Sequence, residues 1–261
     1  MKKALGIFVF LLFTSVCAPA KGFSFDLQAD WSDVLNPNGP WSYRQGDTVL
    51  PATIEPDYGD GIINVWAPPL LFGKFPVAPM LFKLTQQAAN FYGTIYNTPM
   101  QAGEIVTITA PNNGEPLDPA VLANYRWTAP AAGNYDISSK IAPWIEGNPF
   151  EEDYNWKLFI NNTLLASNDF DQTAGFTRAN PDQFSILNQF LNLGDVIKLQ
   201  LGTVTPQGSN SFDATFVTNL TINPSSFAAT VPEPSTAFLM GLALLSMPFV
   251  NKGRALSKRV L

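Results

Sequence analysis

Five aromatic residues lie close to glycine, proline or asparagine, in contexts that are typical of exposed loops. An aromatic ring on such a loop could stack on a sugar ring, which would make these residues a polysaccharide-binding surface. Core packing is the alternative for each of them, since aromatic side chains dominate protein cores. The five residues are Trp31, Trp41, Tyr43, Trp66 and Trp144.

Two groups of carboxylates stand in segments that resemble turns, where hard cations find oxygen ligands. Neither group has the spacing of an EF-hand loop, and ordinary turn chemistry is the alternative. We therefore expect no cofactor other than a structural calcium ion. The candidate ligands are Glu55, Asp57 and Asp60 in the first group, and Asp169 and Asp171 in the second.

Histidine is absent from the whole chain. Catalysis through Ser-His-Asp or Cys-His arrangements is therefore excluded, and neither a Gly-x-Ser-x-Gly nor a Ser-x-x-Lys motif occurs. The carboxylates of Glu151, Glu152 and Asp153 are consecutive and predict a solvated loop rather than an acid/base pair. The sequence favours a non-enzymatic protein, with a hydrolase using two paired carboxylates and a purely structural biofilm or envelope protein as alternatives.

The first 20 residues have the pattern of a secretory signal peptide. Two lysines precede the apolar run Ala4 to Phe13, and Ala18-Pro19-Ala20 provides small residues for cleavage after Ala20. Signal peptidase would then remove Cys17, the single cysteine, so that disulfides could not stabilise the mature protein. Lipid attachment at Cys17 is the alternative, but Val16 stands where that modification expects a small residue.

The other end of the chain combines an apolar segment, residues 237–250, with a terminal basic cluster. A membrane span normally needs about 20 apolar residues, so this segment is short for a permanent anchor. Pro232, Glu233 and Pro234 come directly before it and keep the backbone extended. The alternative is a short single-pass anchor. The basic residues are Lys252, Arg254, Lys258 and Arg259.

This order of Pro-Glu-Pro, apolar helix and basic cluster resembles the PEP-CTERM sorting tail, here residues 229–261. The resemblance implies that exosortase, a membrane-embedded protease or transpeptidase, recognises Pro232, Glu233 and Pro234. It further implies transient insertion into the inner membrane. The final location would be the cell surface or extracellular matrix of a Gram-negative bacterium that makes exopolysaccharide, a candidate partner.

The region between the two ends is acidic. The chain has 15 basic and 21 acidic residues, and six of the basic residues and one acidic residue lie in the ends. Residues 21–230 therefore keep nine basic and 20 acidic residues, a net charge of about −11. The nine basic residues are scattered singly along the sequence. Because nucleic-acid binding needs clustered basic residues, we expect no nucleic-acid partner.

Residues 21–228 predict one all-β domain, a jelly-roll-like sandwich. Alternating or β-branched runs recur between turn residues, and Asn161-Asn162 predicts a hairpin turn. Trp127 and Trp156 fall inside such runs and are expected in the core. Short helices near residues 81–90 and 119–123 are the exceptions. The predicted strands are Ile62 to Trp66, Phe91 to Tyr96, Ile105 to Thr109, Tyr125 to Thr128, Tyr135 to Ile141, Trp156 to Ile160, Val196 to Leu201 and Phe212 to Ile222.

Three segments resemble those of secreted bacterial proteins with jelly-roll domains, many of which carry the same tail. They are residues 30–43, with the Trp41-Ser42-Tyr43 signature, residues 125–135, and residues 212–215. The chain departs from that pattern at Arg44, where those proteins commonly have glycine. The resemblance implies a body like that of lectins or carbohydrate-binding modules.

Overall fold

The computed structural model describes residues 23–54, 64–68, 79–84, 102–109, 122–143, 153–171, 175–203 and 213–225. Within these ranges the chain forms 14 β-strands, and no helix long and apolar enough to cross a membrane occurs there. The signal peptide, the sorting tail with Pro232, Glu233 and Pro234, and the predicted strand at residues 91–96 lie outside the described residues.

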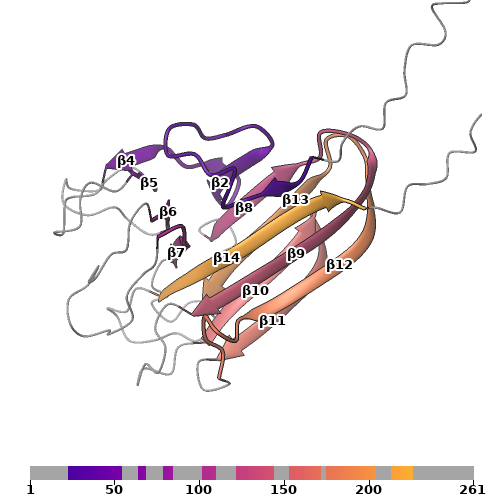
Figure 1. The fold of residues 1–261 in the computed structure, drawn as a ribbon. Coiled ribbons are helices and arrows are strands. Elements are labelled where there is room, and N and C mark those ends of the chain that lie inside the picture. Colours follow the sequence, from indigo (N-terminus) through magenta and orange to yellow (C-terminus); the bar gives the residue numbers. More distant parts are fainter. Residues whose placement is uncertain are drawn as a thin grey trace, which may run out of the picture. The chain divides into compact units, whose positions relative to one another are not determined.

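The strands form two antiparallel sheets (Figure 1). Sheet A has the order β12-β9-β14-β7-β6-β5-β4, with β1 also paired to β14, and sheet B has the order β11-β10-β13-β8-β2-β3. Sheet A consists of β1 (Phe25–Asp26), β4 (Ala52–Ile54), β5 (Asn64–Trp66), β6 (Met80–Lys83), β7 (Ile105–Thr109), β9 (Gly133–Pro143), β12 (Asp182–Leu191) and β14 (Asp213–Pro224). Sheet B consists of β2 (Trp41–Gln45), β3 (Thr48–Val49), β8 (Ala123–Thr128), β10 (Asp153–Ile160), β11 (Thr163–Asp171) and β13 (Val196–Thr203).

The pairing of the last eight strands is that of a jelly roll. β10 pairs with β11, β9 with β12, β8 with β13 and β7 with β14, as in one long hairpin ribbon folded over on itself. The additional pairs β9·β14 and β10·β13 join these hairpins into two four-stranded layers. The all-β, jelly-roll-like prediction is therefore confirmed for the described residues.

One hydrophobic core lies between the sheets. Along β9 the side chains at 135, 137, 139 and 141 are buried, whereas those at 136, 138 and 140 are not, which is the two-residue period of a strand with one face in the core. Aromatic contacts join the layers: Trp127 of β8 lies 5.2 Å from Tyr135 of β9, and Trp156 of β10 lies 4.7 Å from Phe184 of β12, measured between ring centroids. Trp127 and Trp156 are buried, as predicted.

The predicted hairpin at residues 156–165 is confirmed. Ile160 pairs with Thr163, and Asn161 adopts the left-handed backbone conformation, with φ of 54°. Asparagine tolerates this conformation better than most residues. The Asn161 carboxamide also accepts a hydrogen bond from the backbone N–H of Val196 at 2.9 Å, which fastens the turn to β13.

The prediction of short helices was wrong where the structure describes these segments. The described ends of the two expected helices are strands: residues 81–83 belong to β6, and Ala123 begins β8. Leu81 pairs with Trp66 on one side and with Thr107 on the other, so its backbone takes part in a sheet and not in a helix. In β14 the register shifts between Val217 and Asn219, so that Val217, Leu220 and Ile222 all face the core.

Candidate functional site

The candidate aromatic residues are mostly core residues. Trp41, Tyr43 and Trp66 are 1%, 0% and 4% exposed, so the core-packing alternative holds for them in this structure. Trp31 is half-buried and stacks on Tyr43, with ring centroids 4.2 Å apart. Trp144 lies outside the described residues. A sugar-stacking surface made of these five rings is therefore not what the structure assembles.

The loop before β2 forms hydrogen bonds with those aromatic side chains and with the strand that carries them. The Trp41 indole donates to Asp30 at 3.0 Å, and the Trp66 indole donates to the backbone carbonyl of Ser32 at 2.9 Å. Asn36 fixes the start of the sheet, because its amide donates to the carbonyls of Tyr43 and Leu50, both at 2.8 Å. Burial raises the pKa of Tyr43 well above its ordinary range, so the phenol stays neutral. The sequence signature of residues 30–43 is thus a structural motif.

The candidate metal ligands do not gather into a site among the described residues. Glu55, Asp57 and Asp60 lie outside the described residues. Asp169 and Asp171 lie in β11 and not in a turn, and the Asp169 carboxylate accepts a hydrogen bond from the Asn155 amide. Among the described residues no three carboxylate, histidine or cysteine side chains gather as a metal site. The turn prediction for residues 168–171 was wrong, because this segment continues the β10–β11 hairpin.

A polar groove lies on sheet A where β12, β9 and β14 run side by side. Its volume is about 380 Å³. Because residues 135, 137 and 141 of β9 point into the core, the intervening side chains of Ser138 and Lys140 point outward into this groove. We call it the sheet A groove. It is lined by Ser138, Ser139, Lys140, Gln183, Phe184, Ser185, Asn219 and Thr221.

The bulge in β14 shapes this groove. Val217 pairs with Ile141 and Asn219 with Lys140, so residue 218 is the extra residue of β14. Bulges bend a strand and re-aim its side chains. Beyond the bulge, Asn219 and Thr221 take the outward positions, and the Thr221 hydroxyl lies 2.8 Å from that of Ser138 across the strands. Hydroxyl and amide groups thus line the groove without any carboxylate among its lining residues.

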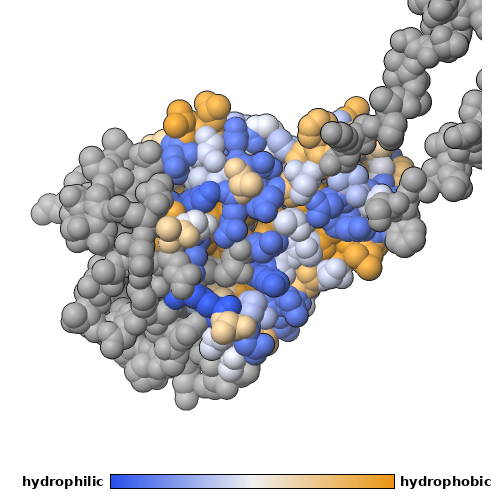
Figure 2. Space-filling model, viewed as in Figure 1, coloured by the Kyte–Doolittle hydropathy of each residue, from blue (hydrophilic) through white to orange (hydrophobic). Residues whose placement is uncertain are grey.

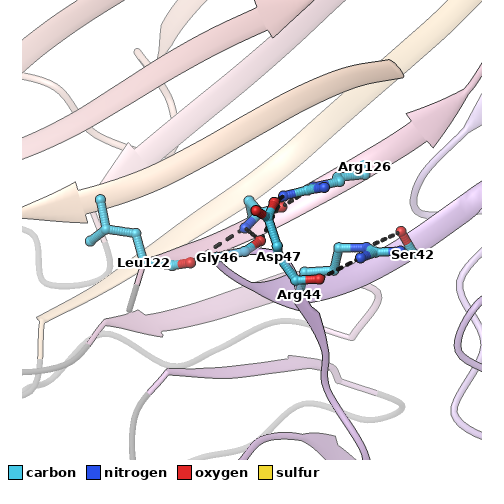
Figure 3. A network of polar contacts seen from close by, with 7 residues as sticks. Ser42, Arg44, Gly46, Asp47, Leu122 and Arg126 are labelled. Atoms are coloured by element: carbon cyan, nitrogen blue, oxygen red, sulfur yellow. Dashed lines mark hydrogen bonds and ion pairs between the residues drawn. The ribbon is translucent and has the colours of Figure 1, made fainter. Parts of the chain in front are cut away.

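The outward side of sheet B carries charge instead. The β2–β3 turn, Gly46-Asp47, meets two arginines: Arg126 donates to the Gly46 carbonyl at 2.7 Å and pairs with the Asp47 carboxylate, and Arg44 donates to the Asp47 carbonyl at 2.6 Å (Figure 3). Hydrophilic residues cover most of the centre of the coloured surface in Figure 2, as expected of outward-facing strand positions.

Neither the sheet A groove nor this charged side was found from the sequence. Basic residues that are scattered in the sequence, such as Arg44 and Arg126, become neighbours because β2 pairs with β8. Only the strand register brings them together, and no local pattern records it. Basic residues that are scattered along the sequence can therefore lie together on one sheet.

Comparisons with known proteins identify no family, since neither a family model nor a curated protein matches this chain. In part it is similar to solved structures. For a family 35 carbohydrate-binding module from Clostridium thermocellum the TM-score is 0.26, at 19% identity over 44% of this chain and 76% of the module. For the CBM36-1 domain of a multidomain xylanase from the hindgut metagenome of Trinervitermes trinervoides, it is 0.28, at 15% identity over 54% and 91%.

A cyclase from Fischerella sp. TAU is similar at a TM-score of 0.36 and 15% identity, over 67% of this chain and 99% of the cyclase. Likenesses at these TM-scores do not establish a shared function. The proteins concerned also differ in kind, because binding modules and an enzyme stand side by side among them.

Proposed function

We propose that this chain is an exported, non-enzymatic protein of the bacterial cell surface or extracellular matrix, and that its sheet A groove binds a polysaccharide. The observation that carries the proposal is the lining of that groove. Ser138, Ser185 and Thr221 offer hydroxyls, and Gln183 and Asn219 offer amides, which can each donate and accept hydrogen bonds. A neutral sugar presents the same donor and acceptor hydroxyls in return.

Binding is favoured over hydrolysis by the same lining. A glycosidase needs two carboxyl groups flanking the bond that it cleaves, and the groove residues include none. Lys140 also lines the groove, and an ammonium group donates hydrogen bonds without accepting any. The groove can therefore hold a sugar chain without acting on it.

Binding can be tested by affinity gel electrophoresis of the full chain in gels containing neutral polysaccharides such as xylan, cellulose derivatives or dextran. Replacing Ser185 by Ala and Thr221 by Val should weaken retardation about tenfold, since a hydrogen bond contributes about 0.5–1.5 kcal/mol. Lys198→Gln on sheet B serves as the control and should bind like the wild type. Absence of retardation by every polysaccharide would favour a purely structural protein, and release of reducing ends would favour a hydrolase.

Export rests on the two chain ends. We propose that signal peptidase cleaves after Ala20 and that exosortase recognises Pro232, Glu233 and Pro234. The support is the order of Pro-Glu-Pro, a short apolar segment and a basic cluster. Mass spectrometry of the surface-exposed protein should find loss of the residues beyond the Pro-Glu-Pro segment. An intact C-terminus ending at Leu261 would contradict processing.

A further inference from the structure

Four of the nine basic residues of the mature region lie on one face. We define the cationic face by Arg44 of β2, Arg126 of β8, Lys198 of β13 and Lys157 of β10. Each of them alternates with residues whose side chains are buried in the core, such as Tyr125, so all four point out of sheet B. A net charge of about −11 makes such a concentration of cations unexpected.

The register arranges this face in two rows. In the first row Arg126 pairs with both Ser42 and Lys198, and Lys198 also pairs with Phe159. In the second row Gln200 pairs with both Asn124 and Lys157, while Arg44 pairs with Asn124. Adjacent strands lie about 4.8 Å apart, so each row of four residues is about 14 Å long. Alternate residues of a strand lie about 7 Å apart, which is the distance between the two rows. The ordered rows are, first, Ser42, Arg126, Lys198 and Phe159, and second, Arg44, Asn124, Gln200 and Lys157.

The two arginines are held in place by the protein itself. A guanidinium has five N–H donors. Arg126 uses Nε on Asn124 and Nη2 on Gly46 and Asp47, and Arg44 uses Nε on Ser42 and Nη1 on the Asp47 carbonyl. Within the described part of the chain this leaves two donors of Arg126 and three of Arg44. Arg44 keeps donors on both terminal nitrogens, as two parallel hydrogen bonds to a planar carboxylate require, whereas both remaining donors of Arg126 are on Nη1 and provide single hydrogen bonds.

The carboxylate of Asp47 shows how an acidic ligand would sit. Its side chain is 95% exposed, yet it reaches back to pair with Arg126. Asp47 and Asp169 lie beside these rows, and Asp169 pairs with Asn155 at the far edge. These two carboxylates therefore both have partners within the protein. Burial, and then the charge of Arg126, lower the pKa of Lys198, so a neighbouring anion would favour its charged form.

A second observation marks the centre of the face as a binding position. Gln200 is 5% exposed as a residue, and its side-chain amide makes no hydrogen bond within the described residues but remains in contact with solvent. Its donor and acceptor groups are therefore open to a ligand. Gln200 lies between Asn124 and Lys157 in the second row, on the outward side of β13. A ligand hydroxyl lying across this row would satisfy it.

We propose that the cationic face binds an acidic polysaccharide, one whose sugars carry carboxylates. The two rows combine cations with amides and a serine hydroxyl. These groups match the carboxylates and hydroxyls that alternate along a flat polysaccharide chain. Duplex DNA, with one charge per about 1.7 Å, would be repelled more strongly, because residues 21–230 have a net charge of about −11. This face lies on the other sheet from the sheet A groove and is independent of it.

The test measures binding of the full chain to immobilised polygalacturonate by biolayer interferometry, with dextran as the neutral comparison. Lys157→Gln combined with Lys198→Gln should weaken polygalacturonate binding at least about tenfold and reduce its salt dependence, because both lost cations are exposed to ligand. The matched control is Leu187→Glu with Phe190→Glu, on β12 of sheet A. Both control positions are exposed, and the change in net charge is the same. The control should bind within about twofold of the wild type.

Several outcomes would overturn the proposal. They are absence of wild-type binding to polygalacturonate, a loss of dextran binding in the Lys157/Lys198 variant as large as its loss of polygalacturonate binding, and equal loss in the control variant. Tighter binding to phosphatidylserine vesicles or to duplex DNA, lost in the same Lys157/Lys198 variant, would assign the face to another partner and also overturn it. Thermal unfolding of every variant checks that the fold is kept, and variants of the sheet A groove should leave polygalacturonate binding unchanged.

Discussion

The two outward sides of the sandwich differ in chemistry, although each is the outer side of strands that bury their other side in the core. In sheet A the sheet A groove, over β9, β12 and β14, offers neutral hydroxyls and amides beside one lysine, Lys140. In sheet B the two rows across β2, β8, β13 and β10 carry four cations and two amides. The inward positions of both sheets are alike, since they join one hydrophobic core. The core thus constrains every second residue only, which leaves each outer side free to acquire its own ligand.

The largest effect is expected from a comparison of alanine substitutions at two neighbouring residues of β13. Leu199 is 0% exposed and points inward, so Leu199→Ala should lower the free energy of unfolding by about 2–5 kcal/mol. Gln200 points outward and has no hydrogen-bond partner within the described residues, so Gln200→Ala should change it by less than about 1 kcal/mol. Urea unfolding followed by tryptophan fluorescence compares them. Equal losses would contradict the separation of core and surface positions.

A smaller effect should separate Arg126 from Lys198 within the first row. Arg126 is 18% exposed and supports the β2–β3 turn through Gly46, so Arg126→Gln should cost about 1.5–3 kcal/mol of stability. Lys198 packs over the Phe159 ring at 4.2 Å, and Lys198→Gln should cost less than about 1 kcal/mol. The same unfolding experiment measures both losses of stability. Arg126→Lys is an additional variant, because it keeps the positive charge but lacks the planar guanidinium. If Arg126→Gln were neutral, the turn would not depend on it.

The smallest effect concerns pH. The hydrogen bond and the charge of Arg126 lower the pKa of Asp47, so Asp47 stays ionised, and keeps neutralising Arg126, until the pH falls below the ordinary aspartate value. Dextran sulfate keeps its charge in acid. Its affinity should therefore rise about two- to fivefold as Asp47 is protonated, and Asp47→Asn should show the raised affinity at neutral pH. Binding measured against pH for both proteins isolates Asp47 from the other carboxylates, because only the wild type should show this additional rise.

Local sequence rules were sufficient where the chain interacts with itself nearby. β7 spans residues 105–109 as predicted, and Asn161 marks the β10–β11 turn because the left-handed conformation favours asparagine. The same rules failed for Trp41 and Tyr43, since proline and asparagine neighbours suggest a loop while cross-strand pairing with Trp127 and Tyr125 buries both rings. Side-chain periodicity says which residues share a face, but not which strand lies opposite.

The sites needed information that the sequence pattern does not hold. The bulge in β14 turns Asn219 toward the groove, and nothing in residues 215–222 signals an extra residue. β12 was missed because its register also shifts, between Ile186 and Gln189, and Leu187 and Phe190 are exposed where a half-buried strand would have polar residues. Arg44 and Lys157 share a face only through β8 and β13, which separate them in sheet B.

The pairing of β1 with β14, Phe25 with Ile222, determines when the domain can fold. β14 is a central strand of sheet A and the last described strand to be synthesised, and both β9 and β7 need it as a neighbour. Contacts between such distant residues close large loops, which makes folding slow compared with locally paired topologies. Local hairpins such as β2–β3 and β10–β11 can form early from adjacent residues. Acquisition of the native fold is therefore a post-translational event for this domain, and a chain that ends before residue 213 would leave β9 and β7 without their shared neighbour.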